Sequence, residues 1–330
     1  MRILFAGSPA IAIPALESVA AVGEGGSSTE MVLAGLLTNP DSPKGRSSRL
    51  EPTECASAAA ALEQPVPILK PEKLDCIARE QVAALKPDLL VSFAYGKIFG
   101  PQFLALFPLG GINIHPSLLP QYRGPTPIPA AIINRDTETG ITIQRLAAEM
   151  DAGDILAQET VPLNGRETTV SLSEIMAKKA ALLLPELLKK VSITDSRPQD
   201  HSAASYCSLI AKEDGLIDWG LSAADIDARI RAFDPWPLSW TVHGELPLCI
   251  LKAEVFDNAG NGAAKAACPN LPGQVLGKDK DKGILIQTGD GILAVRELQY
   301  RAKKALDWKA FLNGTASTTG ARNFLEARLG

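Results

Sequence analysis

The first half of the chain alternates short apolar runs with helical stretches, and this alternation constrains the fold most. Apolar strands separated by helices are typical of βαβ units, which build a mainly parallel sheet. We therefore predict an α/β domain with a parallel-rich, Rossmann-like sheet, ending in a long helix over 168–191 that is interrupted at Pro185. The runs predicted as strands cover 2–6, 31–38, 88–94, 111–115 and 140–146.

The pattern changes after residue 208. Residues 192–207 are polar and lack periodicity, which predicts a linker. Beyond it, short alternating segments separated by Gly, Asp and Asn favour a small antiparallel β-barrel of OB-like form. These segments lie near 238–243, 248–256, 272–277, 283–288 and 292–299. The domains expected are 1–191, the linker 192–207, and the carboxyl-terminal barrel 208–330.

Charge and hydropathy exclude several classes of protein. The chain has 33 Lys and Arg against 37 Asp and Glu, a net charge of −4. That argues against a non-specific nucleic-acid coat and leaves room for a local basic patch. No apolar run reaches the roughly 18 residues of a membrane span, and the apolar start is too short for a signal peptide. We expect a cytoplasmic monomer with no membrane partner.

Cysteine and histidine content argue against a metal site and a disulfide framework. The five cysteines are an odd number without CxxC spacing, and the three histidines are dispersed. The cysteine pattern fits a reducing compartment, and the dispersed histidines make a multi-histidine metal site improbable. We therefore expect no bound metal.

The most informative segment is Gly111-Ile-Asn-Ile-His-Pro-Ser-Leu-Leu-Pro120. Asn113 and His115 are two residues apart, so on a strand they share a face. Pro116 ends the strand and places His115 at its carboxyl end, where open α/β sheets bind ligands. An amide beside an imidazole can stabilise a developing oxyanion. The alternative, a turn-capping asparagine and a structural histidine, has about equal weight on spacing alone.

A second polar segment follows the strand 140–146. Asp151 and Asp154 flank Ala-Gly in a short loop. In isolation, a turn is the favoured interpretation. Brought to His115, a carboxylate would favour the charged imidazolium and could receive a proton. Asp154 is the weaker candidate for that role.

Together and in this order, the two segments resemble the 10-formyltetrahydrofolate-dependent formyltransferases. That family shares an Asn-x-His strand, a Ser-Leu-Leu-Pro loop and a later Asp-x-Gly loop. The resemblance implies an enzyme that transfers a formyl group to an amine, with 10-formyltetrahydrofolate as donor and no metal. It implies a catalytic set of Asn113, His115 and Asp151. The implied folate-binding residues are Ser117, Leu118, Leu119, Pro120, Phe93 and Tyr95.

Further segments narrow the resemblance to members whose acceptor is the α-amine of methionyl initiator tRNA, the substrate formylated for translation initiation. They are the opening Arg2–Pro9, the loop from Asn39 to Arg46, residues 121–128, and the stretch Arg229–Pro237. The resemblance thus implies initiator tRNA and folate as partners. The implied tRNA-binding cations are Lys44, Arg46, Arg49, Lys303 and Lys304. One departure is Ala302, where the family commonly has glycine before paired lysines.

Three other functions stay open at this point. A nicotinamide-dependent oxidoreductase needs Gly-x-Gly-x-x-Gly after the first strand, and Ser8-Pro9-Ala10 stands there instead. A non-catalytic RNA-binding protein would leave the polar set around His115 unexplained. Within formyl transfer, the acceptor could be a small amine or water.

Overall fold

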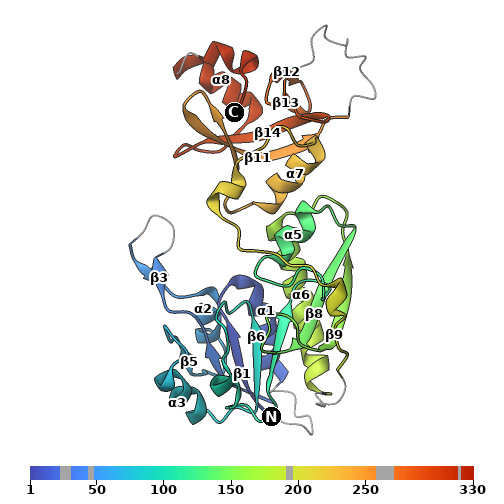
Figure 1. The fold of residues 1–330 in the computed structure, drawn as a ribbon. Helices are drawn as coiled ribbons and strands as arrows, with labels where there is room; N and C mark the ends of the chain where they lie inside the picture. The colour runs from blue at the N-terminus through green and yellow to red at the C-terminus, as the bar shows by residue number, and fades with distance from the viewer. Residues whose placement is uncertain (23–30, 44–47, 191–195, 258–270, 319–320) are drawn as a thin grey trace. The chain divides into compact units, whose positions relative to one another are not determined.

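The computed structural model describes residues 1–22, 31–43, 48–190, 196–257, 271–318 and 321–330 (Figure 1). They pack as two compact units. The first contains Met1–Pro127, Glu138–Pro162 and Ser171–Ser208; the second contains Ile128–Thr137, Leu163–Val170 and Leu209–Gly330. The domain boundaries expected at 191 and 208 stay predictions.

The first unit is built on a seven-stranded sheet of order β5-β2-β1-β6-β7-β8-β9. Pairing is parallel from β5 to β7 and antiparallel from β7 to β9. The expected parallel-rich sheet is therefore confirmed. Its strands are β1 (Arg2–Gly7), β2 (Val32–Leu37), β5 (Ile68–Leu69), β6 (Leu89–Phe93), β7 (Gly111–His115), β8 (Glu138–Arg145) and β9 (Ile155–Pro162).

Two of these strands were not predicted. Strand β5 has only two residues, and β9 is half-buried and polar along Gln158-Glu159-Thr160, so neither forms an apolar run. A separate two-stranded hairpin joins β3 (Ser42–Pro43) to β4 (Leu50–Glu51).

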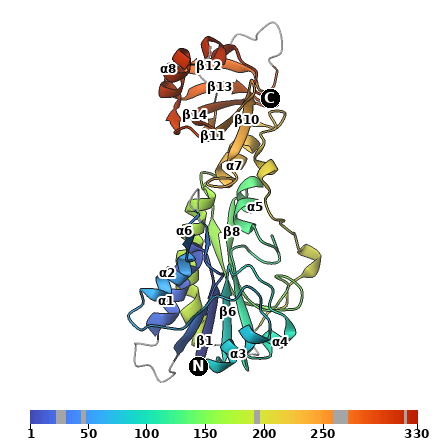
Figure 2. The same cartoon turned by 90° about the vertical axis from the view of Figure 1, so that its left-hand side faces the viewer.

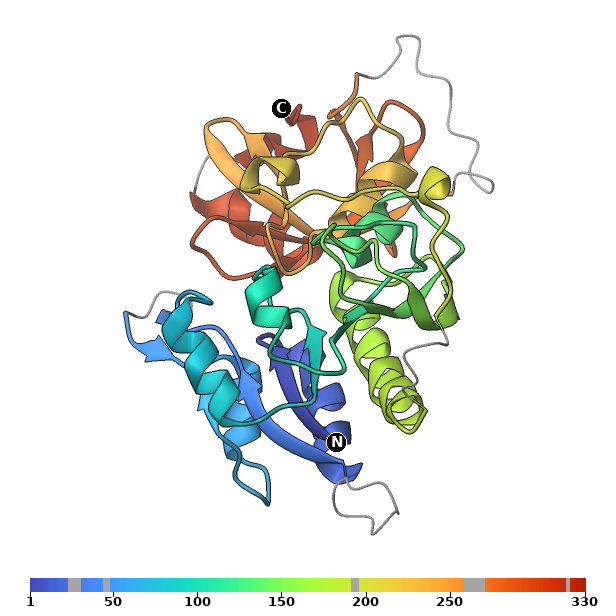
Figure 3. The same ribbon diagram turned by 60° about the horizontal axis from the view of Figure 1, so that its bottom comes forward.

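Helices cover both faces of the first sheet. Figure 2 places α1, α2 and α6 on one side and α4 on the other. On the α4 side, Val82 and Phe103 pack in one cluster with strand residues Leu4 and Leu90. The interruption predicted at Pro185 is wrong: helix α6 contains Pro185 near its carboxyl end and runs as one continuous coil, lime green in Figure 3. The helical segments are η1 (Ala10–Ala12), α1 (Ile13–Val22), α2 (Glu54–Ala60), α3 (Cys76–Ala84), α4 (Pro101–Leu104), α6 (Thr169–Leu188) and η2 (His201–Ala203).

The loops at the carboxyl ends of the parallel strands are tied together. Ser8 Oγ, just after β1, accepts hydrogen bonds from the backbone N–H and side-chain amide of Asn39, at 3.1 and 3.0 Å. Asn39 Nδ2 also donates to the carbonyl of Tyr95 at 2.9 Å. The loops after β1, β2 and β6 therefore form one connected edge.

The second unit contains an antiparallel sheet of order β10-β11-β14-β13-β12, with β15 paired to β14. All five predicted strands of this half are present. They are β10 (Ser239–His243), β11 (Leu246–Val255), β12 (Val275–Asp279), β13 (Gly283–Gln287) and β14 (Ile292–Tyr300), with β15 (Leu306–Asp307) added. The helical segments of this part are α5 (Pro127–Ile133), η3 (Lys212–Gly215), α7 (Ala223–Ala232), α8 (Trp308–Thr318) and η4 (Ala321–Glu326).

The carboxyl-terminal residues join the two outer strands of this sheet. The backbones of Gly330 and Val242 in β10 exchange hydrogen bonds of 3.0 and 3.2 Å. On the other side, Val275 N in β12 donates to Ala327 O at 2.9 Å. The side chain of Leu329 is buried in the core of this unit. The tail thus completes a ring of hydrogen-bonded backbone, which gives the sheet a barrel-like closure.

Candidate active site

Asn113 and His115 lie on one face of β7, as their alternation predicts. In the antiparallel pairing with β8, Asn113 stands opposite Gln144 and His115 stands opposite Thr142. His115 is 4% exposed, and Asn113 is half-buried. The two functional groups are therefore fixed by strand register rather than by a loop.

The ring of His115 has one defined proton. Its Nε2 lies 2.8 Å from the carbonyl oxygen of Tyr122. Because a carbonyl oxygen only accepts, Nε2 carries a hydrogen. Nδ1 lies 3.6 Å from Asp151 Oδ2, so this second nitrogen faces the carboxylate. It holds a proton when the ring is cationic and a lone pair when the ring is neutral.

The carboxylate of Asp151 is held by three N–H donors. Its Oδ1 accepts from Gln144 Nε2 at 2.9 Å and from Asn113 Nδ2 at 3.3 Å. Its Oδ2 accepts from Gly124 N at 2.9 Å. The backbone of Asp151 has φ +53°, a left-handed conformation that costs a residue with a side chain about 1–2 kcal/mol. The structure thus brings Asn113, His115 and Asp151 together, as predicted.

The loop that follows β7 supplies two of these contacts through its backbone. Tyr122 and Gly124 both have positive φ, +56° and +116°. A Cβ on Gly124 would overlap the carbonyl oxygen of Cys207. This turn needs glycine at 124, because both the backbone angle and the space exclude a side chain.

Asp154 does not join the cluster at His115. Its Oδ2 accepts a hydrogen bond from Ser196 Oγ at 2.8 Å, and its carbonyl accepts from Arg145 N at 2.9 Å. It fastens the loop to the segment after α6, in line with its place as the weaker candidate.

The residues expected to bind folate are mostly buried. Ser117 Oγ donates to Gln121 O at 2.6 Å, and Leu119 is 3% exposed, while Leu118 and Pro120 are half-buried. Phe93 and Tyr95 are 1% and 2% exposed. The ring of Tyr95 stacks on Phe99, and burial raises the pKa of its hydroxyl to about 12. Contact of Phe93 or Tyr95 with a ligand would therefore come from the backbone.

The cations expected to contact tRNA come from both units of the chain. Arg49, Lys303 and Lys304 are exposed, and Lys303 Nζ lies 5.7 Å from the centre of the Tyr300 ring. Lys44 and Arg46 lie outside the described residues. Exposed loop cations suit phosphate contacts, and their role here stays a prediction.

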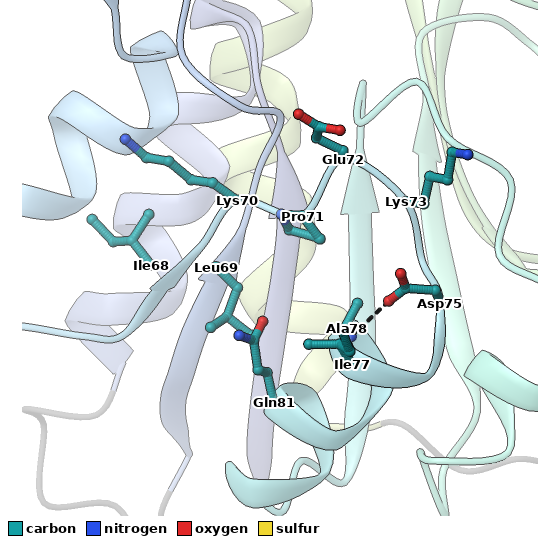
Figure 4. A pocket seen from close by; sticks show the side chains of 10 residues that line it. All are labelled: Ile68, Leu69, Lys70, Pro71, Glu72, Lys73, Asp75, Ile77, Ala78 and Gln81. Atoms are coloured by element: carbon teal, nitrogen blue, oxygen red, sulfur yellow. Dashed lines mark hydrogen bonds between the residues drawn. The ribbon is translucent and has the colours of Figure 1, made fainter.

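A pocket of about 470 Å³ lies away from these residues (Figure 4). It is bounded by the end of β5 and the start of α3, and neither His115 nor Asp151 lines it. Asp75 in its wall caps helix α3 by accepting from Ala78 N at 3.1 Å. Its lining is Ile68, Leu69, Lys70, Pro71, Glu72, Lys73, Asp75, Ile77, Ala78 and Gln81.

The described part of the chain contains neither a cluster of metal ligands nor a membrane-spanning helix. Within it, no group of three or more His, Cys, Asp or Glu side chains is arranged to hold a metal ion. Over the same residues, no helix combines the length and apolar character needed to cross a membrane.

Three supporting residues were missed by sequence reasoning: Gln144, Arg123 and Gln199. Gln144 lies on the predicted strand 140–146, but its place opposite Asn113 follows from the pairing of β7 with β8, which the sequence alone does not show. Arg123 is only 1% exposed although it lies in the loop after β7, and its guanidinium donates to Gln199 Oε1. No local pattern marks Gln199, which lies in the segment predicted as a linker.

The cluster suits group transfer to a nucleophile that the substrate brings. Asn113 and His115 can offer hydrogen-bond donors to a developing negative charge, and Asp151 can accept a proton. The chain matches the family model for formyl transferase over residues 1–188 and that for the formyl transferase carboxyl-terminal domain over 209–316. Fold and site thus define a two-domain formyl transferase.

Individual relatives narrow this class. The chain is 49% identical over 323 residues to the methionyl-tRNA formyltransferase of Treponema denticola, covering 96% of this chain and 97% of the relative. It belongs to the methionyl-tRNA formyltransferase family. The fold matches the methionyl-tRNA formyltransferase from Clostridium thermocellum, with a TM-score of 0.54 and 17% identity over 78% of this chain and 95% of that one. The fold also matches HypX from Aquifex aeolicus in complex with tetrahydrofolic acid, with a TM-score of 0.60 and 18% sequence identity. That match covers 96% of this chain and 48% of HypX.

Proposed function

We propose that the chain transfers the formyl group of 10-formyltetrahydrofolate to the α-amine of methionyl initiator tRNA, with Asn113, His115 and Asp151 as its catalytic residues. The product, N-formylmethionyl-tRNA, serves translation initiation. The observation that carries the proposal is the convergence of these three side chains within a chain 49% identical to a methionyl-tRNA formyltransferase. All three side chains come from one chain, so a single copy of the protein holds the complete set of proposed catalytic residues.

The folate donor supplies an activated formyl carbon. The residues near His115 are suited to hold it: Leu118 and Pro120 leave part of their surface exposed, and Asn113 adds a half-buried amide donor. Flat heterocycles bind in clefts of this mixed apolar and polar character. Phe93 and Tyr95 belong to the proposal only through their backbones.

The protein's contribution is position, charge stabilisation and proton transfer. Holding two reactants in register can lower the barrier by roughly 7–11 kcal/mol. Attack by an amine puts negative charge on the formyl oxygen, and each well-placed donor there is worth about 2.7–4 kcal/mol. The amide of Asn113 and the positive charge of a protonated His115 fill that role. Asp151 orients His115 and receives the amine proton, directly or through water. Collapse of the tetrahedral intermediate then breaks the bond between the formyl carbon and N10 of the folate, and N10 takes up that proton as tetrahydrofolate leaves.

The RNA acceptor is the part of the proposal that rests on the second domain and the loop after β2. Arg49, Lys303 and Lys304 are exposed cations that suit phosphate oxygens. Lys44 and Arg46 belong to the same proposal on sequence grounds. Phosphate contacts of this kind position the RNA and make its binding sensitive to salt.

Acceptor choice tests the function directly. With 10-formyltetrahydrofolate present, we expect the purified chain to formylate methionyl initiator tRNA and to leave free methionine unmodified at equal concentration. The measurement is acid-stable formyl-methionine recovered from each acceptor, with formate release followed in parallel. Transfer to free methionine at the same rate, or release of formate without formylated RNA, would contradict the proposal.

A further inference from the structure

Residues 196–208, here called the strap, run along the candidate active site although they form no strand and only a short 3₁₀ turn. The backbone N–H of Arg123 donates to Ser205 O at 2.9 Å, and Cys207 N donates to Arg123 O at 2.8 Å. At the other end, Arg197 and Ile155 exchange backbone hydrogen bonds of 2.8 Å. The strap is therefore fixed to the loop that carries Tyr122 and Gly124.

One strap side chain reaches the loop of Asp151. Gln199 is 6% exposed, and its Nε2 lies 2.9 Å from the carbonyl oxygen of Asp151 and 2.6 Å from that of Gly153. An amide nitrogen has two hydrogens, so it can serve both carbonyls at once. The side chain thus clamps the backbone on both sides of Ala152.

Arg123 fixes which way this amide points. Its Nε and Nη2 both donate to Gln199 Oε1, at 3.2 and 2.7 Å, and the guanidinium is buried. A flipped amide would turn its N–H₂ toward the guanidinium and its oxygen toward two carbonyls. The donors of Gln199 are therefore held on the Asp151 side.

The two hydrogen bonds from Gln199 hold the loop at Asp151, whose backbone conformation is unfavourable. Asp151 adopts φ +53°, a conformation that a non-glycine residue keeps only when its surroundings fix it. With this angle set, its carboxylate reaches Gly124 N and faces His115 Nδ1. Loss of the two Gln199 donors would free the loop and move the carboxylate.

We propose that Gln199 is a positioning residue for formyl transfer, which holds the left-handed backbone of Asp151 so that its carboxylate faces His115. The inference rests on the proposed function. It assigns a role in the reaction to a segment that the sequence marks only as a linker.

The most informative variant is Gln199→Glu. It keeps an oxygen acceptor for Arg123, so the buried guanidinium stays paired, and it removes both donors to the Asp151 loop. We expect kcat to fall about 10- to 100-fold, because small displacements of a reacting group have effects of that size. KM for both substrates should stay unchanged. Gln199→Met removes both the donors and the acceptor, so its kcat should fall by at least as much. Gln64→Met, at an exposed glutamine of the same unit, is the control.

A double-mutant cycle separates positioning from general damage. If Gln199 acts through Asp151, then Gln199→Glu should change kcat less than about threefold when Asp151→Asn is already present. Losses that multiply in the double variant would overturn the proposal, because they would show that Gln199 acts independently of Asp151.

A second readout needs no catalysis. The Gly124 amide proton donates to Asp151 Oδ2, so its chemical shift reports where that carboxylate lies. We expect Gln199→Glu to move this signal toward its position in Asp151→Asn, while Gln64→Met leaves it unchanged. An unmoved Gly124 signal would overturn the inference. An inactive wild-type chain would instead count against the proposed function, and the Gly124 signal would still decide the role of Gln199.

Discussion

Replacing Asp151 by asparagine is expected to lower kcat for formyl transfer by about 10²- to 10⁴-fold, the usual range for loss of a general acid or base. The substitution keeps the size of the side chain and removes its charge. It leaves His115 Nδ1 facing a neutral amide and takes away the proton acceptor. The measurement is the single-turnover rate of transfer with enzyme in excess over methionyl-tRNA.

Asp154→Asn is the matched control for this experiment. It changes a second carboxylate of the same loop, whose hydrogen bond from Ser196 Oγ an asparagine oxygen can still accept. We expect it to lower the rate little. Equal losses in the two variants would contradict the assignment of Asp151 and point to a general effect of charge in this loop.

The second large effect is expected for Gly124→Ala. The new Cβ would overlap the carbonyl oxygen of Cys207, and φ there is +116°. Steric overlap costs about 1–3 kcal/mol and the left-handed backbone about 1–2 kcal/mol more. We expect the free energy of unfolding to fall by about 2–5 kcal/mol in total, measured by urea denaturation followed by fluorescence. The rate should fall as well, because Gly124 N–H would leave Asp151.

Gly110→Ala separates the cost of steric overlap from the cost of the left-handed backbone. Gly110 has φ +73° with nothing near the position of a new Cβ, so only the backbone cost applies. The free energy of unfolding of this variant should fall by about 1–2 kcal/mol, and its activity should stay unchanged. If Gly124→Ala were no more damaging than Gly110→Ala, the close approach of the strap to this loop would be refuted.

Much of the fold could be predicted because apolar periodicity is local. All ten predicted strands are present, and the long helix predicted over 168–191 appears as α6 (Thr169–Leu188). The catalytic candidates could be predicted for the same reason: the two-residue spacing of Asn113 and His115 fixes their common face. The placement of Asp151 beside them came from resemblance, since spacing along the chain does not show where a loop folds.

The supports of the site could not be predicted, because their partners are distant in sequence. Gln199 and Arg123 are 76 residues apart and both are nearly buried, yet each lies in a stretch that is polar and irregular. Hydrogen bonds to a distant part of the chain leave no local sequence pattern. A polar segment without periodicity is therefore predicted as a linker even when such bonds fix it in place. The same holds for Gly330, whose backbone pairs with Val242.

The most direct test of the account is formyl transfer from 10-formyltetrahydrofolate to methionyl initiator tRNA, measured for wild type and His115→Ala side by side. We predict rapid formylation by the wild type and a collapse of the rate in the variant, with folate binding retained. Wild-type activity that survives the substitution would keep the reaction and contradict the site. Absence of transfer by a wild-type chain that binds folate would contradict the reaction itself.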